Sequence, residues 1–111
     1  MFIDTQVRPQ GEVLDAVAPS KMKLSAAIRI GARLRPQCRR RFYAHGGSCA
    51  IGAAYEALGI TRYATDVDAW NRLLYLTGLH DGEIPHWEIT SRNDRGESRE
   101  SIADWLEAQG L

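Results

Sequence analysis

Residues 46–59 decide the fold, and their sequence is GGSCAIGAAYEALG. The two opening glycines let the chain turn, and the Ser48 side chain can cap the first free N–H groups of a helix. Gly59 suits the left-handed position that ends a helix. Between these limits the stretch is apolar nearly all round, with small alanines and with bulky residues at helical spacing, namely Ile51, Tyr55 and Leu58. We therefore predict a helix over Cys49–Leu58 at the centre of a helical bundle.

Helix start and stop signals recur on both sides of this stretch. Ser25 is a good N-cap for a helix over Ala26–Leu34, and Pro36 ends it because the residue before a proline avoids helical angles. Further helices are expected at Thr65–Thr77 before Gly78, at His86–Arg92 after Pro85, and at Arg99–Gln109 between a Ser98 cap and Gly110. The segment 93–96 is typical of a tight turn. The sequence thus predicts a compact all-α domain of roughly four to five helices over residues 21–111, without a convincing strand pair.

Large apolar residues at helical spacing predict one shared core. Its expected members are Ile51, Tyr55, Leu58, Trp70, Leu73, Leu74, Ile102, Trp105 and Leu106. Leu34, Val67, Trp87 and Ile89 are expected on the apolar faces of their helices. Residues 1–20 lack such spacing and are interrupted by prolines and a glycine, so we expect an irregular N-terminal arm.

Length and composition indicate the broad class. The 111 residues suit one domain, and 44% hydrophobic with 25% charged residues is typical of a soluble globular protein. No apolar run approaches the ~20 residues that a membrane-spanning helix needs, and the N-terminus lacks the features of a secretory signal. Two cysteines without a short spacing favour a reducing compartment. We therefore expect a cytoplasmic protein without a membrane partner.

Charge is segregated along the chain. Residues 1–48 contain nine basic and three acidic residues, whereas residues 49–111 contain five basic and eleven acidic residues. The densest basic run, residues 39–41, precedes two aromatic residues. Such a run can pair with the acidic part of the chain, contact an acidic protein, or bind phosphates and stack on bases. The partner-binding candidates are Arg35, Arg39, Arg40, Arg41 and Tyr43.

Cys49 is the sharpest catalytic candidate. A cysteine in the first turn of a helix feels the positive end of the helix dipole, which lowers the pKa of the thiol and favours the thiolate. The candidate bases are His45, His80 and His86, and the candidate orienting groups are Asp94 and Asn93. The simpler interpretation is a small buried residue where helices cross, which the neighbouring Ala50 and Gly52 favour. We therefore expect a buried, slowly reacting thiol and no catalytic site.

A metal site is the second chemical possibility. Cys38, His45 and Cys49, together with His80 or His86, would supply nitrogen and sulfur ligands. Their spacing is not that of a zinc finger or knuckle, and Cys38 adjoins three arginines. We therefore expect no bound metal and no cofactor.

Three stretches of the chain occur in a recognisable order. They are KLSAAIRIGA at residues 23–32, SCAIGAA at residues 48–54, and Asn93-Asp94 followed by SRESIADWLE at residues 98–107. They resemble a family of small bacterial and phage proteins with the pattern LSxAIRxGA, CAxGA, Asn-Asp and (S/T)RExIADW. The resemblance covers residues 21–107 and implies a mainly helical fold, and it carries no known activity. This chain departs from the pattern because the polar run 90–92 precedes Asn93, and because residues 61–87 lack the Cys-Pro-x-Cys pair of some relatives.

The sequence favours a protein without catalysis. We expect a small phage-type or prophage-type accessory protein, in the cytoplasm of a bacterial host, that binds a protein partner. Inhibition of a host defence system or enzyme is one form of this function, and a virion or assembly role is another. Two alternatives stay open, namely a nucleic-acid-binding module that uses Arg39–Arg41 and a cysteine-dependent enzyme that uses Cys49.

Overall fold

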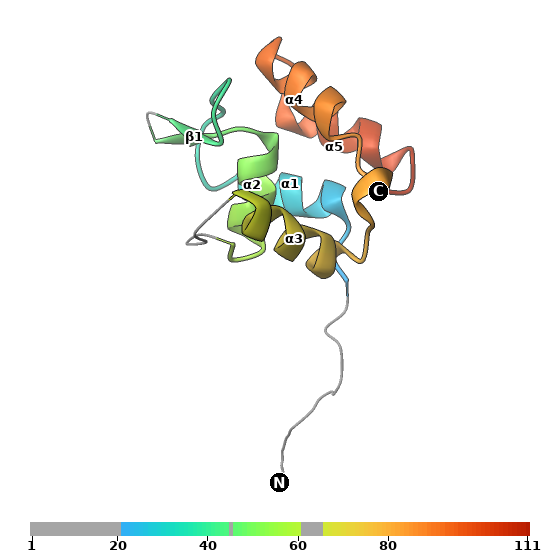
Figure 1. Ribbon diagram of the computed structural model, residues 1–111. Helices are drawn as coiled ribbons and strands as arrows, with labels where there is room; N and C mark the ends of the chain where they lie inside the picture. Colours follow the sequence, from blue (N-terminus) through green and yellow to red (C-terminus); the bar gives the residue numbers. More distant parts are fainter. Residues whose placement is uncertain (1–20, 45, 61–65) are drawn as a thin grey trace, which may run out of the picture.

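The computed structural model describes residues 21–44, 46–60 and 66–111. The expected N-terminal arm, His45 and the expected helix start at Thr65 lie outside these ranges. Within them the chain forms five α-helices, a short antiparallel hairpin and one 3-10 turn (Figure 1). The prediction of a compact, mainly helical fold is confirmed.

The described elements follow one another along the chain. Their bounds are α1 (Leu24–Ala32), β1 (Tyr43–Ala44), β2 (Gly47–Ser48), α2 (Ala50–Ala57), α3 (Asp66–Thr77), η1 (Asp81–Glu83), α4 (His86–Asp94) and α5 (Arg99–Glu107). Two predicted end signals are confirmed. The Ser98 hydroxyl accepts a hydrogen bond from the Ser101 N–H at 3.0 Å, and Gly59 has a left-handed φ of 75° after α2.

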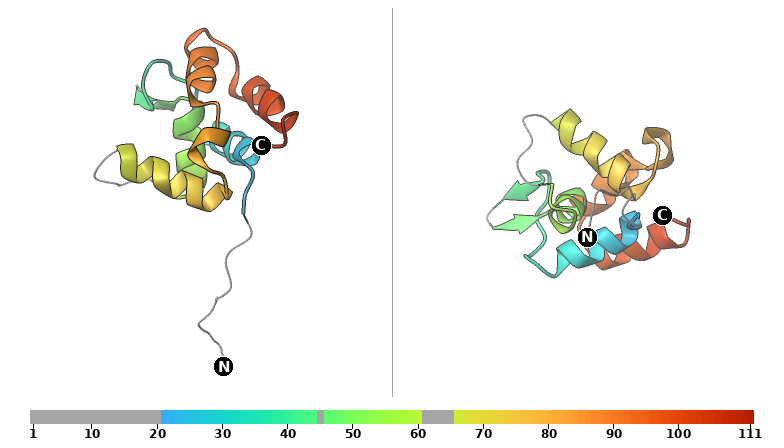
Figure 2. Two further views of the ribbon diagram at one scale, coloured as in Figure 1. Left: turned by 45° about the vertical axis from the view of Figure 1, so that its right-hand side comes forward. Right: turned by 90° about the horizontal axis from the view of Figure 1, so that it is seen from below.

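Helix α2 lies at the centre of the fold, as its apolar sequence predicts. Every residue from Ala50 to Tyr55 is buried, and α2 contacts α1, α3 and α4 (Figures 1 and 2). Helix α5 completes the bundle by packing on α1 and α4. All nine predicted core residues belong to this core or pack against it. The core prediction is therefore confirmed.

Helices α1 and α2 cross with their backbones in close approach. A Cβ atom placed on Gly31 would lie 1.8 Å from the Ala53 carbonyl oxygen. A Cβ atom on Gly52 would likewise lie 2.4 Å from the Phe42 carbonyl oxygen, on the other side of α2. Small residues on both helices are what allows this spacing, because any larger side chain would push the helices apart.

Two predicted helix caps are wrong. Helix α1 begins at Leu24, so Ser25 lies inside it and is buried, with its N–H donating to the Leu111 carbonyl at 3.2 Å. Ser48 does not cap α2, because it belongs to β2 of a hairpin that the sequence did not predict. The cap is Cys49, whose sulfur accepts a hydrogen bond from the Gly52 N–H at 3.3 Å.

Three apolar side chains are exposed where the spacing predicts burial. They are Leu34, Val67 and Trp87, and Trp87 has 82% of its surface exposed. Helix α1 ends at Ala32, which leaves Leu34 in a turn beyond the packed face. On α4, Ile89 is buried while Trp87 lies on another side of the helix. The predicted tight turn at residues 93–96 is also displaced, because Asn93 and Asp94 are the last residues of α4.

Arg99 fastens the C-terminal helix to the hairpin and to the end of α1. Its buried guanidinium donates to the Ser48 hydroxyl (2.9 Å), the Ala32 carbonyl (3.3 Å) and the Arg35 carbonyl (2.8 Å). The bond to Ala32 satisfies a carbonyl group at the C-terminal end of α1. In the ranges that the structure describes, none of the helices is long and apolar enough to cross a membrane.

Candidate functional site

The segment between α1 and β1 carries the three consecutive arginines, which we call the arginine loop (Arg39–Arg41). Its first part runs beside β2, because the Cys38 N–H donates to the Ser48 carbonyl at 2.9 Å and the Ser48 N–H donates to the Pro36 carbonyl at 2.8 Å. Arg40 has a φ of 64°, a left-handed value that residues with a side chain rarely adopt. The loop therefore needs contacts that hold this turn.

The buried amide of Asn93 is the first of these contacts. Its oxygen accepts hydrogen bonds from the Gln37 side-chain amide at 2.8 Å and from the Ala50 N–H at 3.1 Å. Its nitrogen donates to the Cys38 carbonyl at 2.8 Å. One side chain at the end of α4 thus joins the start of α2 to the segment that leads into the arginine loop.

Asp94 and Gly96 supply the next contacts. The Asp94 carboxylate accepts a hydrogen bond from the Arg40 backbone N–H at 2.7 Å. The Arg39 guanidinium lies on the turn after α4, where a Cβ on Gly96 would approach one of its nitrogens to 2.7 Å. The Asn-Asp pair therefore holds the arginine loop, rather than only closing a turn between two helices.

The candidate partner-binding residues differ in the contacts that their side chains make within the protein. The side chains of Arg39, Arg40 and Arg41 are exposed, and within the described ranges none of them forms a salt bridge. Arg35 instead donates to the Glu56 carboxylate at 2.9 and 2.5 Å. Tyr43 is 43% exposed, and its hydroxyl donates to the Gly52 carbonyl at 3.1 Å. The three loop arginines are thus the side chains that remain open to a partner.

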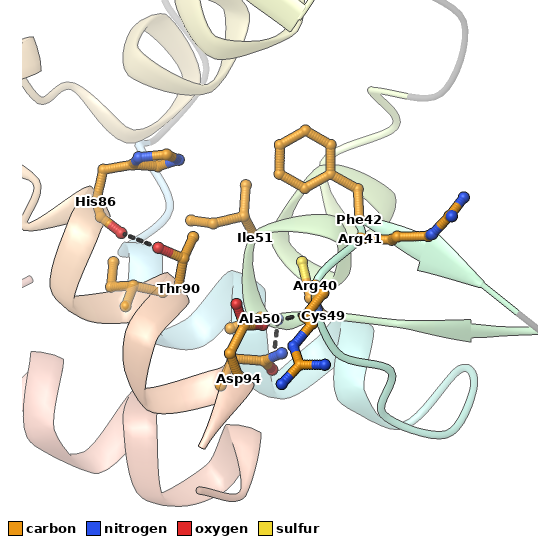
Figure 3. A pocket seen from close by; sticks show the side chains of 11 residues that line it. Arg40, Arg41, Phe42, Cys49, Ala50, Ile51, His86, Thr90 and Asp94 are labelled. Atoms are coloured by element: carbon orange, nitrogen blue, oxygen red, sulfur yellow. Dashed lines mark hydrogen bonds between the residues drawn. The ribbon is translucent and has the colours of Figure 1, made fainter. Parts of the chain in front are cut away.

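A pocket of about 370 Å³ opens beside the arginine loop (Figure 3). Its lining residues are Arg40, Arg41, Phe42, Cys49, Ala50, Ile51, His86, Ile89, Thr90, Asn93 and Asp94. Four of the catalytic candidates therefore border one space, namely Cys49, His86, Asn93 and Asp94, whereas His80 does not. In Figure 3 the Ile51 side chain lies between the His86 ring and Cys49.

Cys49 lacks the properties of an activated nucleophile. It is 5% exposed, and burial raises the pKa of its thiol more than the N–H groups of Gly52 and Ile51 lower it. No hydrogen bond in the described part of the chain joins its sulfur to His86 or Asp94. The His86 ring instead packs edge-on against Trp70, with the ring centroids 4.8 Å apart. The expectation that Cys49 is a buried thiol is confirmed.

The candidate metal ligands in the described ranges, Cys38, Cys49, His80 and His86, do not form a cluster that could hold an ion. No group of three or more His, Cys, Asp or Glu side chains in residues 21–44, 46–60 and 66–111 has a metal-binding arrangement. His45 lies outside these ranges.

Two features of the site were missed by sequence reasoning. The sequence predicts Asn93 as a turn residue or as an orienting group for a catalytic base, whereas its side chain bonds residues more than forty positions away, as with Ala50 at a separation of 43. The exposure of Trp87 could not be predicted from the sequence, because helical spacing alone does not distinguish it from a core residue.

Comparisons of the chain with protein-family models, curated proteins and solved structures find no match. The family resemblance therefore stays a prediction.

Proposed function

We propose that this protein acts without catalysis, by binding a protein partner through the arginine loop and the pocket beside it. The observation that carries the proposal is the fixed, exposed arrangement of the three loop arginines, which have no salt-bridge partner in the described ranges while Asn93 and Asp94 hold the backbone beneath them. A loop whose backbone is already held in place loses less entropy when a partner binds.

The residue types around the loop are those that most often contribute binding energy at protein interfaces. Arginine, tyrosine and tryptophan are enriched among such residues. Trp87 stands three and seven positions before Thr90 and Asp94, which both line the pocket, so it shares their stripe of α4. A partner that covers the arginine loop would therefore also cover Trp87 and the pocket.

The mixed charge and the apolar groups around the loop favour a protein over a nucleic acid. Asp94 lines the pocket, and Glu88 is exposed on α4, so a phosphate backbone laid across the site would meet carboxylates. The pocket also presents apolar groups from Phe42, Ile51 and Ile89. An apolar centre beside charged residues is the usual composition of a protein interface.

The cellular location and the biological role of the protein are predicted from the sequence alone. The cytoplasm of a bacterial host, and a phage-type role as an inhibitor or an assembly factor, stay predictions. The proposal of a role without catalysis is supported by the burial of Cys49, which raises the pKa of its thiol.

Quantitative capture from a nuclease-treated lysate of the native host tests the proposal. The loop variant combines Arg39→Ala, Arg40→Gly and Arg41→Ala, with glycine at position 40 because it accepts the left-handed φ. A control variant removes three exposed positive charges elsewhere, by Lys23→Ala, Arg33→Ala and Arg72→Ala. All three proteins are first compared by circular dichroism and by urea unfolding.

The proposal predicts a protein that the unchanged chain and the control variant retain and that the loop variant loses. Nuclease treatment should not release it. A loop variant that unfolds at much lower urea than the control would show that the arginines serve stability. Retention of the same proteins by all three chains would contradict a binding role for the loop.

A further inference from the structure

A second pocket, of about 380 Å³, lies next to the first and has a different chemistry. We call it the aromatic pocket, and its lining residues are Phe42, Tyr55, Asp66, Val67, Trp70, Asp81 and His86. Phe42 and His86 also line the first pocket, and Figure 3 shows their rings at the same edge of it. The two pockets are therefore neighbours across these two side chains.

Three aromatic residues from different elements line this pocket. Phe42 comes from the segment before β1, Tyr55 from α2 and Trp70 from α3. Phe42 and Tyr55 pack edge to face with their centroids 5.6 Å apart, while the Trp70 indole N–H donates to the Asp81 carboxylate at 2.6 Å. These contacts fix the rings in place. A group of aromatic rings around one space is the arrangement that attracts organic cations.

Two carboxylates add negative charge to the same space. Asp66 lies at the first position of α3, and Asp81 lies at the first position of η1. Neither forms a salt bridge with a basic residue in the part of the chain that the structure describes. The charge of Asp66 also reaches Tyr55, since burial and then Asp66 raise the pKa of Tyr55 to about 12. The lining of the aromatic pocket thus contains two carboxylates and neither Lys nor Arg, whereas the first pocket is lined by Arg40 and Arg41 together with Asp94.

We infer that the aromatic pocket binds the cationic head group of a lysine or arginine side chain from a protein partner, between the rings of Tyr55 and Trp70 and the carboxylates of Asp66 and Asp81. Its volume is near the lower end for ligand sites, which suits one side chain better than a large ligand. This inference rests on the proposed function in one respect, namely that the cation belongs to a protein partner. Such a partner would present acidic groups to the arginine loop and a basic group beside them.

Nuclear magnetic resonance titration with single amino acids tests the inference on the full chain. The probes are lysine and arginine, each blocked as the Nα-acetyl N-methylamide, and the equally blocked norleucine, which has an apolar stem without the charge. Choline serves as a free organic cation. The reporter is the indole N–H signal of Trp70, and the indole signals of Trp87 and Trp105 are internal references, because neither residue lines the aromatic pocket.

Blocked lysine and blocked arginine are expected to shift the Trp70 signal, while blocked norleucine at the same concentration does not. Asp66→Asn should weaken the lysine response by about threefold, because one exposed carboxylate is removed. The matched variant Glu100→Gln, on the distant start of α5, should leave it unchanged. The loop variant should also leave it unchanged, so a failure of the proposed function remains distinguishable from a failure here.

Several results would overturn the inference. An equal response to blocked norleucine would identify an apolar pocket without preference for a cation. An unmoved Trp70 signal with all probes would exclude the site. Tighter binding of choline than of either blocked amino acid would assign the pocket to a free small molecule rather than to a partner's side chain.

Discussion

The Asp94 carboxylate accepts a hydrogen bond from the backbone N–H of Arg40 at 2.7 Å, and Arg40 has a left-handed φ of 64°. The last residue of α4 thus fixes the conformation of a loop that lies far from it in the sequence. This contact separates two roles of the arginine loop. Its backbone belongs to the fold, whereas its three side chains extend from the fold toward solvent.

Removal of the Asp94 carboxylate should loosen the loop without unfolding the protein. Asp94→Ala should lower the free energy of unfolding by about 1.5 kcal/mol, since one hydrogen bond to a charged group is lost. Arg40→Gly should change it by no more than about 0.5 kcal/mol, because glycine accepts the same φ. Urea unfolding measures both. Faster hydrogen exchange at the Arg40 amide in Asp94→Ala is the matching local result, and an unchanged exchange rate would contradict the assigned contact.

The crossing of α1 and α2 should tolerate no side chain at Gly31. Gly31→Ala places a methyl group against the Ala53 carbonyl and should cost about 3 kcal/mol or more. Gly82→Ala is the matched control, because no atom lies within 4 Å of a Cβ at that position. Thermal and urea unfolding of the two variants should differ clearly. Similar stabilities would show that the helices do not cross this closely.

The two cysteines should react at very different rates. Cys38 is half-buried, whereas Cys49 is buried and burial raises the pKa of its thiol. Iodoacetamide at neutral pH should therefore modify Cys38 first, and Cys49 only when the protein unfolds. Cys49→Ser should fold and lower the free energy of unfolding by no more than about 1 kcal/mol, because the serine hydroxyl can accept the Gly52 N–H bond that partly offsets its burial. Rapid alkylation of Cys49 in the folded Cys38→Ser variant would favour the enzyme alternative instead.

The stability of the protein should fall at high pH because of Tyr55. Its pKa is about 12 in the folded protein, against an ordinary value of 10.0, so the folded state binds the proton more tightly. The contribution of the protonated Tyr55 to the free energy of unfolding is fully present below pH 10. It is lost as the pH rises to about 12, at up to about 1.4 kcal/mol for each pH unit. Tyr55→Phe should flatten this decline relative to the unchanged protein. Parallel declines in the two proteins would place the titrating group elsewhere, at Tyr43 or Cys49.

Local signals in the sequence were sufficient to predict most of the helices. Some features depend only on residues that are neighbours in the sequence, so they could be predicted from it. They are the apolar stretch that forms α2, the Ser98 cap of α5 and the helix end at Gly59. Ser25 and Ser48 were assigned as caps by the same logic, and both assignments were wrong. Tertiary contacts decided these cases, because Leu111 covers the start of α1 and the hairpin takes Ser48.

The site depends on contacts that the sequence does not display. The three consecutive arginines could be picked out, but the Asn93 amide that joins α2 to Cys38 could not, because its partners are distant in the chain. The contacts of the buried Arg99 could not be predicted for the same reason, because its hydrogen bond to Ala32 joins residues that are 67 positions apart. Both pockets form where several elements meet, and no single stretch of sequence predicts such a space.

The central claim is that the arginine loop contacts a protein rather than the phosphates of a nucleic acid. Fluorescence anisotropy with generic duplex DNA and with generic RNA, at low and at moderate salt, tests this most directly, because both kinds of partner would use the same exposed arginines. We predict weak binding that differs little between the unchanged protein, the loop variant and the control variant. Tight binding that falls by ~10³-fold or more as the salt rises, and that the loop variant loses, would contradict the account.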